Sequence, residues 1–181
     1  MNIRKPTDYS TLFVELDTLM AAQLPQMELY CEIGRVVSGR SEKGAAVAAS
    51  EYLQAAYPAA EGFSPRNLRR MRAFYAAYEE SPEIMHLAMR LGWTRNVAIL
   101  EGCGSNKERA WYIRAALRFG WKKAKLLESI KTQAWRNSSL DEQVVSCYTG
   151  EKEITQESES DEEDTLCVSW KYLPQPHGRV R

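Results

Sequence analysis

The residues best suited to do chemistry in this sequence are arginines gathered in the stretch Gly62–Tyr78, GFSPRNLRRMRAFYAAY. Ser64 is a favourable N-cap, and Pro65 suits the first helical position, where its missing N–H costs nothing. The stretch therefore predicts a helix whose first turns carry the candidate DNA-contacting residues Arg66, Asn67, Arg69, Arg70 and Arg72. Guanidinium groups placed in this way suit contacts with a phosphate backbone. A solvated basic face with no ligand is the alternative interpretation.

The same stretch carries an apolar pattern with the period of a helix. Leu68, Met71, Phe74, Tyr75 and Tyr78 recur at spacings of three and four residues, which places them on one face. The arginines fall largely off that face. The helix is therefore expected to be buried on one side and cationic on the other.

Charge is distributed unevenly along the 181 residues, although the formal net charge is zero. Residues 64–136 contain 15 Lys and Arg against 6 Asp and Glu, whereas residues 137–166 contain one Lys against 10 Asp and Glu. A basic body followed by an acidic tail suits a nucleic-acid surface that the tail screens or mimics. An acidic tail that only aids solubility is the alternative. Four further basic residues are expected to support DNA binding: Arg95, Lys122, Lys123 and Lys125.

Periodicity and helix-stop residues predict an all-α fold. The expected helices cover residues 8–20, 27–37, 43–57, 64–78, 83–91, 95–101, 107–119 and 122–135, with Pro25 kinking or restarting the chain between the first two. The order of elements over residues 43–78 is that of a helix-turn-helix unit. Two Gly-Trp turns, at residues 92–93 and 120–121, are expected to place each tryptophan where two helices meet.

Two domains of different character are expected. Residues 1–136 form a helical DNA-associated domain, and residues 137–181 form an acidic, largely disordered tail with a short apolar patch at 166–173. No run of 18 apolar residues occurs, and the N-terminal stretch lacks an apolar signal region. The expectation is a cytoplasmic protein that does not contact membranes.

Catalytic chemistry has little support in the sequence. No GxxxxGK[ST] or GxGxxG phosphate loop occurs, and neither His86 nor His177 has the orienting partner that a hydrolase triad needs. The cysteines form no CxxC pair, so neither a zinc site nor a disulfide framework is expected; they are Cys31, Cys103, Cys147 and Cys167. We therefore expect no enzyme activity, no metal and no cofactor.

Three sequence blocks taken together resemble a known family. Residues 28–37 (ELYCEIGRVV), residues 62–78 and residues 91–130, from LGWTRNVAIL to KLLESI, are similar to the N-terminal domain of YhcG-type PD-(D/E)XK nucleases. The resemblance covers about residues 8–135. It implies an all-helical, winged-helix-like or helix-turn-helix-related module that associates with DNA and is usually followed by a nuclease domain.

The chain departs from that pattern after Trp135, where an acidic tail stands in place of the nuclease domain. The resemblance therefore carries over DNA association but not hydrolysis. The expected function is binding of duplex DNA together with modulation of a nuclease, most specifically as a mobile-element anti-CRISPR protein acting on Cas9 with its guide RNA. The alternative is an interaction module that pairs with a separate nuclease or with a second copy of the chain, forming a homodimer.

Overall fold

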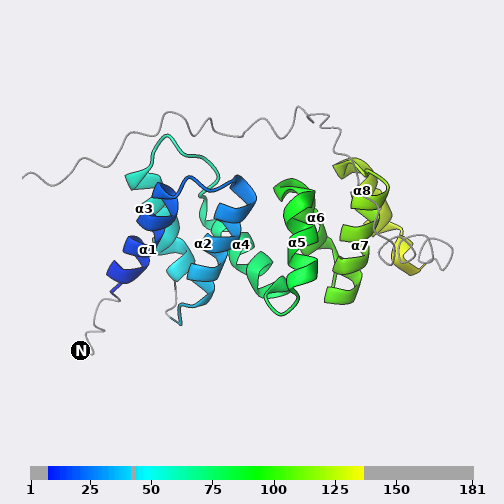
Figure 1. The fold of residues 1–181 in the computed structure, drawn as a ribbon, viewed down its shortest axis with the longest axis horizontal. Helices are drawn as coiled ribbons and strands as arrows, with labels where there is room; N and C mark the ends of the chain where they lie inside the picture. Colours follow the sequence, from blue (N-terminus) through cyan, green and yellow to red (C-terminus); the bar gives the residue numbers. More distant parts are fainter. Residues whose placement is uncertain (1–7, 42–43, 137–181) are drawn as a thin grey trace, which may run out of the picture. The chain divides into compact units, whose positions relative to one another are not determined.

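The computed structural model describes residues 8–41 and 44–136, and its regular structure there is helical. Eight α-helices and one 3-10 turn occur within those ranges, with no strand among them, so the predicted all-α fold is confirmed (Figure 1). The elements are α1 (Ser10–Ala21), α2 (Gln26–Ser38), α3 (Ala45–Ala56), α4 (Pro65–Tyr78), α5 (Pro82–Leu91), α6 (Trp93–Gly102), α7 (Asn106–Arg118), α8 (Lys123–Lys131) and η1 (Ala134–Arg136). The tail at 137–181, with its apolar patch at 166–173, lies outside the described residues.

Two compact units make up the described chain, and the division between them falls inside α4. The first unit ends at Arg72 and the second begins at Ala73. The sequence predicts one helical domain over residues 1–136, and the structure divides the described part of it more finely. Each unit has buried apolar side chains of its own.

In the first unit, α1, α2 and α3 pack against one another. Their amphipathic faces supply fully buried side chains, as the apolar spacing requires; these are Leu12, Leu16, Leu29, Ile33, Val37 and Leu53. The Phe13 ring of α1 stacks on the Tyr52 ring of α3, with centroids 4.2 Å apart and planes 7° apart. This contact holds α1 and α3 side by side.

A carboxylate joins the same two helices. Asp17 accepts a hydrogen bond from the Tyr52 hydroxyl at 2.7 Å and another from the Tyr57 hydroxyl at 2.9 Å. Burial, followed by the hydrogen bond to Asp17, raises the pKa of Tyr52 to about 12. The pKa of Tyr57 is raised for the same reasons. Both hydroxyls therefore remain protonated donors to Asp17 well above neutral pH.

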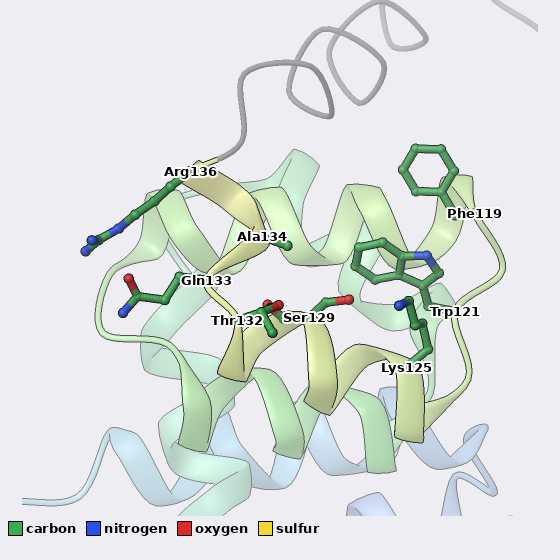
Figure 2. A pocket seen from close by; sticks show the side chains of 8 residues that line it. All are labelled: Phe119, Trp121, Lys125, Ser129, Thr132, Gln133, Ala134 and Arg136. Carbon is green, nitrogen blue, oxygen red and sulfur yellow. The ribbon is translucent and has the colours of Figure 1, made fainter.

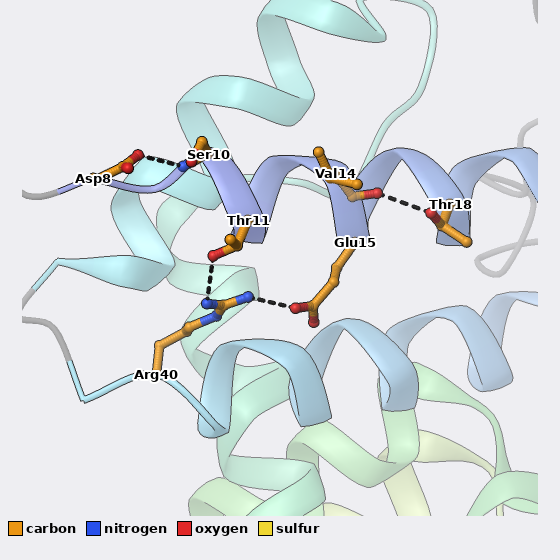
Figure 3. Close-up of polar contacts among 7 residues, drawn as sticks. All are labelled: Asp8, Ser10, Thr11, Val14, Glu15, Thr18 and Arg40. Atoms are coloured by element: carbon orange, nitrogen blue, oxygen red, sulfur yellow. Dashed lines mark hydrogen bonds and ion pairs between the residues drawn. The ribbon is translucent and has the colours of Figure 1, made fainter.

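Arg40, which follows α2, connects the end of that helix to α1 (Figure 3). Its guanidinium donates to Thr11 Oγ1 at 2.8 Å and pairs with Glu15 Oε1 at 2.6 Å. Pro25 restarts the chain rather than kinking a continuous helix, because α1 ends at Ala21 and Pro25 is the N-cap residue of α2. The restart lets the two helices fold back on one another.

The second unit contains the rest of α4 together with α5 to α8, and the closest packing is of α5 on α7 and of α6 on α8. Its fully buried side chains include Phe74, Leu91, Ile99, Tyr112, Ile113 and Leu126. At Gly102 a Cβ atom would lie 2.8 Å from Ile130 Cγ2, so the glycine allows α6 and α8 to approach closely. Tyr112 donates a hydrogen bond to the Ser129 carbonyl oxygen at 3.0 Å and so fixes α7 to α8.

The first Gly-Trp turn in this unit differs from the prediction, since Trp93 begins α6 instead of lying in a turn before it. The reason is Asn96, which is fully buried and donates to the Ala88 carbonyl oxygen at 2.7 Å and to the Gly92 carbonyl oxygen at 2.8 Å. These bonds satisfy backbone acceptors at the α5–α6 junction. The Trp93 ring packs edge-on against Phe74 at 5.9 Å, as expected of an anchor between helices.

Helix α8 is shorter than the sequence predicted. It ends at Lys131 instead of continuing to Trp135, because Gln133 adopts a positive φ of 53° and the chain tightens into the 3-10 turn η1. Leu127 of α8 has the apolar spacing of a core residue, but it is 45% exposed. Tyr75 of α4, predicted to be buried, is half-buried.

Candidate nucleic-acid interface

Side-chain hydrogen bonds within the first unit fix the start of α4. Ser64 Oγ accepts from the backbone N–H of Asn67 at 3.3 Å, which confirms the predicted N-cap. Pro65 is the first residue of the helix, also as predicted. Asn67 Nδ2 donates to the Gly62 carbonyl oxygen at 2.6 Å and so ties the helix to the preceding turn.

That turn is itself held by helices of the same unit. Gly62 has a φ of +85°, and a Cβ atom there would collide with the hydroxyl of Tyr30. The next residue, Phe63, is buried, and its carbonyl oxygen accepts from Ser50 Oγ at 2.5 Å and from Gln54 Nε2 at 2.9 Å. Helix α3 thereby positions the segment that leads into α4.

The first half of α4 has the two sides that the sequence predicted. Leu68 and Met71 are fully buried. The basic side consists of Arg66, Arg69 and Arg72, which are exposed, and of Arg70, which is half-buried. We call these four residues the α4 arginine face. Asn67, the fifth residue predicted here to contact DNA, uses its side chain to hold the turn before the helix.

Electrostatics at the start of α4 favour an anion. The first turn contains no acidic residue, although a helix N-terminus favours negative charge. Arg66 lies in that turn, so its charge adds to the positive end of the helix dipole. Arg69 and Arg72 make no hydrogen bond or ion pair with any residue that the structure describes. This arrangement contributes little to the stability of the fold. It raises the positive electrostatic potential outside the helix.

The other predicted basic residues come together in the second unit. Arg95 Nη1 donates a long hydrogen bond to the Trp121 carbonyl oxygen at 3.4 Å, which brings it beside the start of α8. Lys122 is the N-cap residue of α8 and Lys123 is its first residue. Lys125 pairs with Glu128 at 2.9 Å, in a contact whose side chains are 57% and 63% exposed. We call Arg95 and the three lysines the α8 basic cluster.

The structure therefore places the predicted residues on two basic surfaces, and each belongs to its own unit. The α4 arginine face lies before the division at Arg72, and the α8 basic cluster lies after it. As at α4, no acidic residue occurs in the first turn of α8. Each surface has the charge and exposure that phosphate contacts require.

A pocket that no sequence motif indicated lies beside the α8 basic cluster, within the second unit (Figure 2). Its volume is about 770 Å³, and it is lined by Phe119, Trp121, Lys125, Ser129, Thr132, Gln133, Ala134 and Arg136. The second Gly-Trp turn is the sequence feature that marks this pocket, although its pattern predicts only an interhelical anchor. Trp121 does pack 6.3 Å from Trp111, and it also forms a wall of the pocket.

Candidate metal ligands and nucleophiles are few in the described part of the chain. No cluster of three or more His, Cys, Asp or Glu residues suited to a metal ion occurs there. Burial raises the pKa of Cys31 to about 11 and that of Cys103 to about 12, so both thiols are protonated at neutral pH. Protonated, buried thiols are poor nucleophiles. His86 is exposed.

Comparison with known proteins gives one match. A family model described as the DUF1016 N-terminal domain matches residues 16–137, which is more than half of the chain. No curated protein matches, and no solved structure does. None of the described helices has the length and apolar character needed to cross a bilayer.

Proposed function

The chain belongs to the DUF1016 N-terminal domain family, and from this premise we propose that it is a non-catalytic protein that binds duplex DNA and modulates a nuclease. The α4 arginine face is the surface proposed to contact the phosphate backbone. The observation that carries the proposal is that Arg69 and Arg72 are exposed on a helix capped by Ser64 and make no ion pair with a described residue.

Arg69 and Arg72 have no evident role in stabilising the fold. An arginine that stabilises the fold is expected to meet a carboxylate or a carbonyl oxygen, as Arg40 does with Glu15. Arg69 and Arg72 meet neither, while Leu68 and Met71 between them anchor the helix in the core. Exposed guanidinium groups on an anchored helix can reach phosphates without further ordering of the backbone, which the helix has already fixed.

The α8 basic cluster supports the same function from the second unit. Its lysines present charges that contact phosphate without reading base sequence. Its ion pair between Lys125 and Glu128 is exposed on both sides, so it contributes little stability and is readily exchanged for a phosphate.

Modulation of a nuclease is proposed on the family resemblance and on the charge distribution. The resemblance is to a domain that normally precedes a nuclease domain. The acidic stretch at residues 137–166 is suited to a positively charged nucleic-acid channel, and the channel of Cas9 with its guide RNA is the one proposed. Cleavage of target DNA by guide-loaded Cas9 is expected to slow when the full-length protein is added and to recover when a chain ending at residue 136 replaces it.

Duplex binding is tested most simply by its salt dependence. Anisotropy of a labelled duplex is measured at about 50 mM and about 200 mM NaCl, because each phosphate contact releases counterions. Four arginine contacts give a slope of log K against log salt of about −3.6. No binding at either salt concentration would contradict the DNA-binding function and leave the protein-interaction or homodimer interpretation in its place.

A further inference from the structure

The pocket of the second unit has an aromatic end and a polar end (Figure 2). Phe119 and Trp121 lie at one end, Gln133 and Arg136 lie at the other, and Ser129 and Thr132 lie between them. A volume of about 770 Å³ is within the range of small-molecule sites. The pocket can therefore hold a group with one flat apolar part and several polar atoms.

The aromatic end is fixed by the turn that follows α7. Gly120 has a φ of +60°, and the Trp121 backbone N–H donates to the Ala116 carbonyl oxygen at 3.0 Å. This is the long bond of a Schellman motif, in which a left-handed glycine ends the helix. The turn brings the Phe119 and Trp121 rings into a stack, with centroids 5.7 Å and planes 25° apart.

Trp121 is supported from behind by a buried residue of α7. Its ring lies 6.3 Å from that of Trp111, which is 6% exposed. Trp121 itself is half-buried, so part of its surface remains available to the pocket. A supported aromatic face of this kind loses little conformational freedom when a second ring stacks on it.

Cations lie at both ends of the pocket. Lys125 lies close to Trp121, and Arg136 lies at the opposite end, where its guanidinium is 5.6 Å from the Trp135 ring. The amide side chain of Gln133 makes no hydrogen bond with any described residue. An amide offers both a donor and an acceptor, which is the pattern that the edge of a nucleobase requires.

These features together match a nucleotide whose base is not paired. The base would stack on the aromatic end, its edge would reach polar atoms in the pocket, and its flanking phosphates would meet Lys125 and Arg136. In duplex DNA both faces of a base are stacked, so the base has no free face to offer. We propose that this pocket binds an unpaired nucleotide of a single-stranded nucleic acid. The inference does not depend on duplex binding by the α4 arginine face.

The test compares labelled single-stranded thymidine oligomers and labelled duplex DNA on the full-length protein. Trp121→Ala removes the stacking face and is expected to weaken single-strand binding about tenfold, with duplex binding unchanged. Trp121→Phe retains a ring and is expected to restore most of that affinity. Lys131→Ala is the matched control, because this exposed residue of α8 does not line the pocket.

A second variant distinguishes loss of binding from loss of folding. Lys125→Ala with Gln133→Ala changes two exposed side chains, and it is also expected to weaken single-strand binding severalfold while leaving the unfolding midpoint unchanged. Equal single-strand affinity of the wild type and this double variant would overturn the proposal. Complete displacement of the oligomer by equimolar thymidine monophosphate would also overturn it, since the pocket would then bind free nucleotides and not a strand.

Discussion

The side-chain amide of Asn67 donates to the carbonyl oxygen of Gly62 at 2.6 Å, so the arginine-bearing helix is tied to the turn before it. The same residue donates its backbone N–H to Ser64 Oγ. Asn67 therefore helps to set the direction of α4 with both its side chain and its backbone amide. The orientation of Arg66 and Arg69 depends on this local geometry.

Asn67→Ala is expected to destabilise the protein by about 1 kcal/mol, because the Gly62 carbonyl oxygen loses its side-chain donor. Urea denaturation measures the change. Glu61→Ala is the control, since this exposed residue of the same turn is expected to alter stability by less than about 0.5 kcal/mol. Equal stability of the two variants would show that the Asn67 side chain does not fix the start of the helix.

Gly102→Ala is expected to destabilise the protein by about 1–3 kcal/mol, because the added methyl group meets Ile130 Cγ2 at 2.8 Å. Thermal denaturation of the variant checks this. Adding Ile130→Leu to the variant is expected to recover part of the loss, because leucine is not branched at Cβ and lacks the Cγ2 methyl group.

Gly104→Ala provides a matched control for this prediction. A Cβ atom at Gly104 meets no atom within 4 Å, so the substitution is expected to be neutral or slightly stabilising. If both alanine variants unfolded at the same temperature, close approach of α6 and α8 at Gly102 would not be a feature of the folded protein.

Tyr78→Phe is expected to leave stability unchanged or to raise it by up to about 1 kcal/mol. The Tyr78 hydroxyl is buried and has no hydrogen-bond partner among the described residues, so its removal relieves a desolvation cost. Tyr112→Phe is the contrasting variant and is expected to lose about 1 kcal/mol with its bond to the Ser129 carbonyl oxygen. If Tyr78→Phe also lost about 1 kcal/mol of stability, the Tyr78 hydroxyl would have a stabilising partner.

Stability is expected to fall as the pH rises from about 10 towards 12. An unfolded tyrosine ionises near pH 10, whereas Tyr52 in the folded protein has its pKa raised to about 12. The unfolded state therefore binds fewer protons in this window, and the free energy of unfolding decreases with pH. Tyr57, whose pKa is also raised, contributes in the same direction.

Urea denaturation at about pH 9 and about pH 11 measures this dependence. Tyr52→Phe with Tyr57→Phe is expected to be less stable at the lower pH, because Asp17 loses both donors. The same double variant is expected to lose less stability between the two pH values than the wild type. If the double variant and the wild type lost the same stability between the two pH values, the pH dependence would come from other titratable groups.

Much of the fold follows from local signals in the sequence. Ser64 and Pro65 marked the start of α4, and Pro25 marked a break between α1 and α2. The buried positions Leu68, Met71 and Phe74 followed from a spacing of three and four residues. These features depend on neighbours within one or two helical turns, so a single sequence can show them.

Features that depend on distant residues were not predictable in the same way. Gln133 breaks α8 although glutamine is a good helix former, and Leu127 has the spacing of a core residue but is exposed. Asn96 is a buried polar residue whose partners lie across a helix junction. The basic residues were found by type alone, and their division between two units followed only from the three-dimensional contacts.

Arg69→Glu with Arg72→Glu tests whether the α4 arginine face contacts the phosphates of duplex DNA. Lys107→Glu with Arg118→Glu is the matched control, because it makes the same charge change at two exposed positions of α7. Anisotropy on labelled duplex DNA gives the affinity of each variant as a function of salt, and circular dichroism verifies that both remain folded. The α4 variant is expected to lose duplex binding at least about tenfold, with a salt slope shallower by about two, while the α7 variant is expected to bind nearly as the wild type does. Equal losses in the two variants, or unchanged binding by the α4 variant, would contradict that contact.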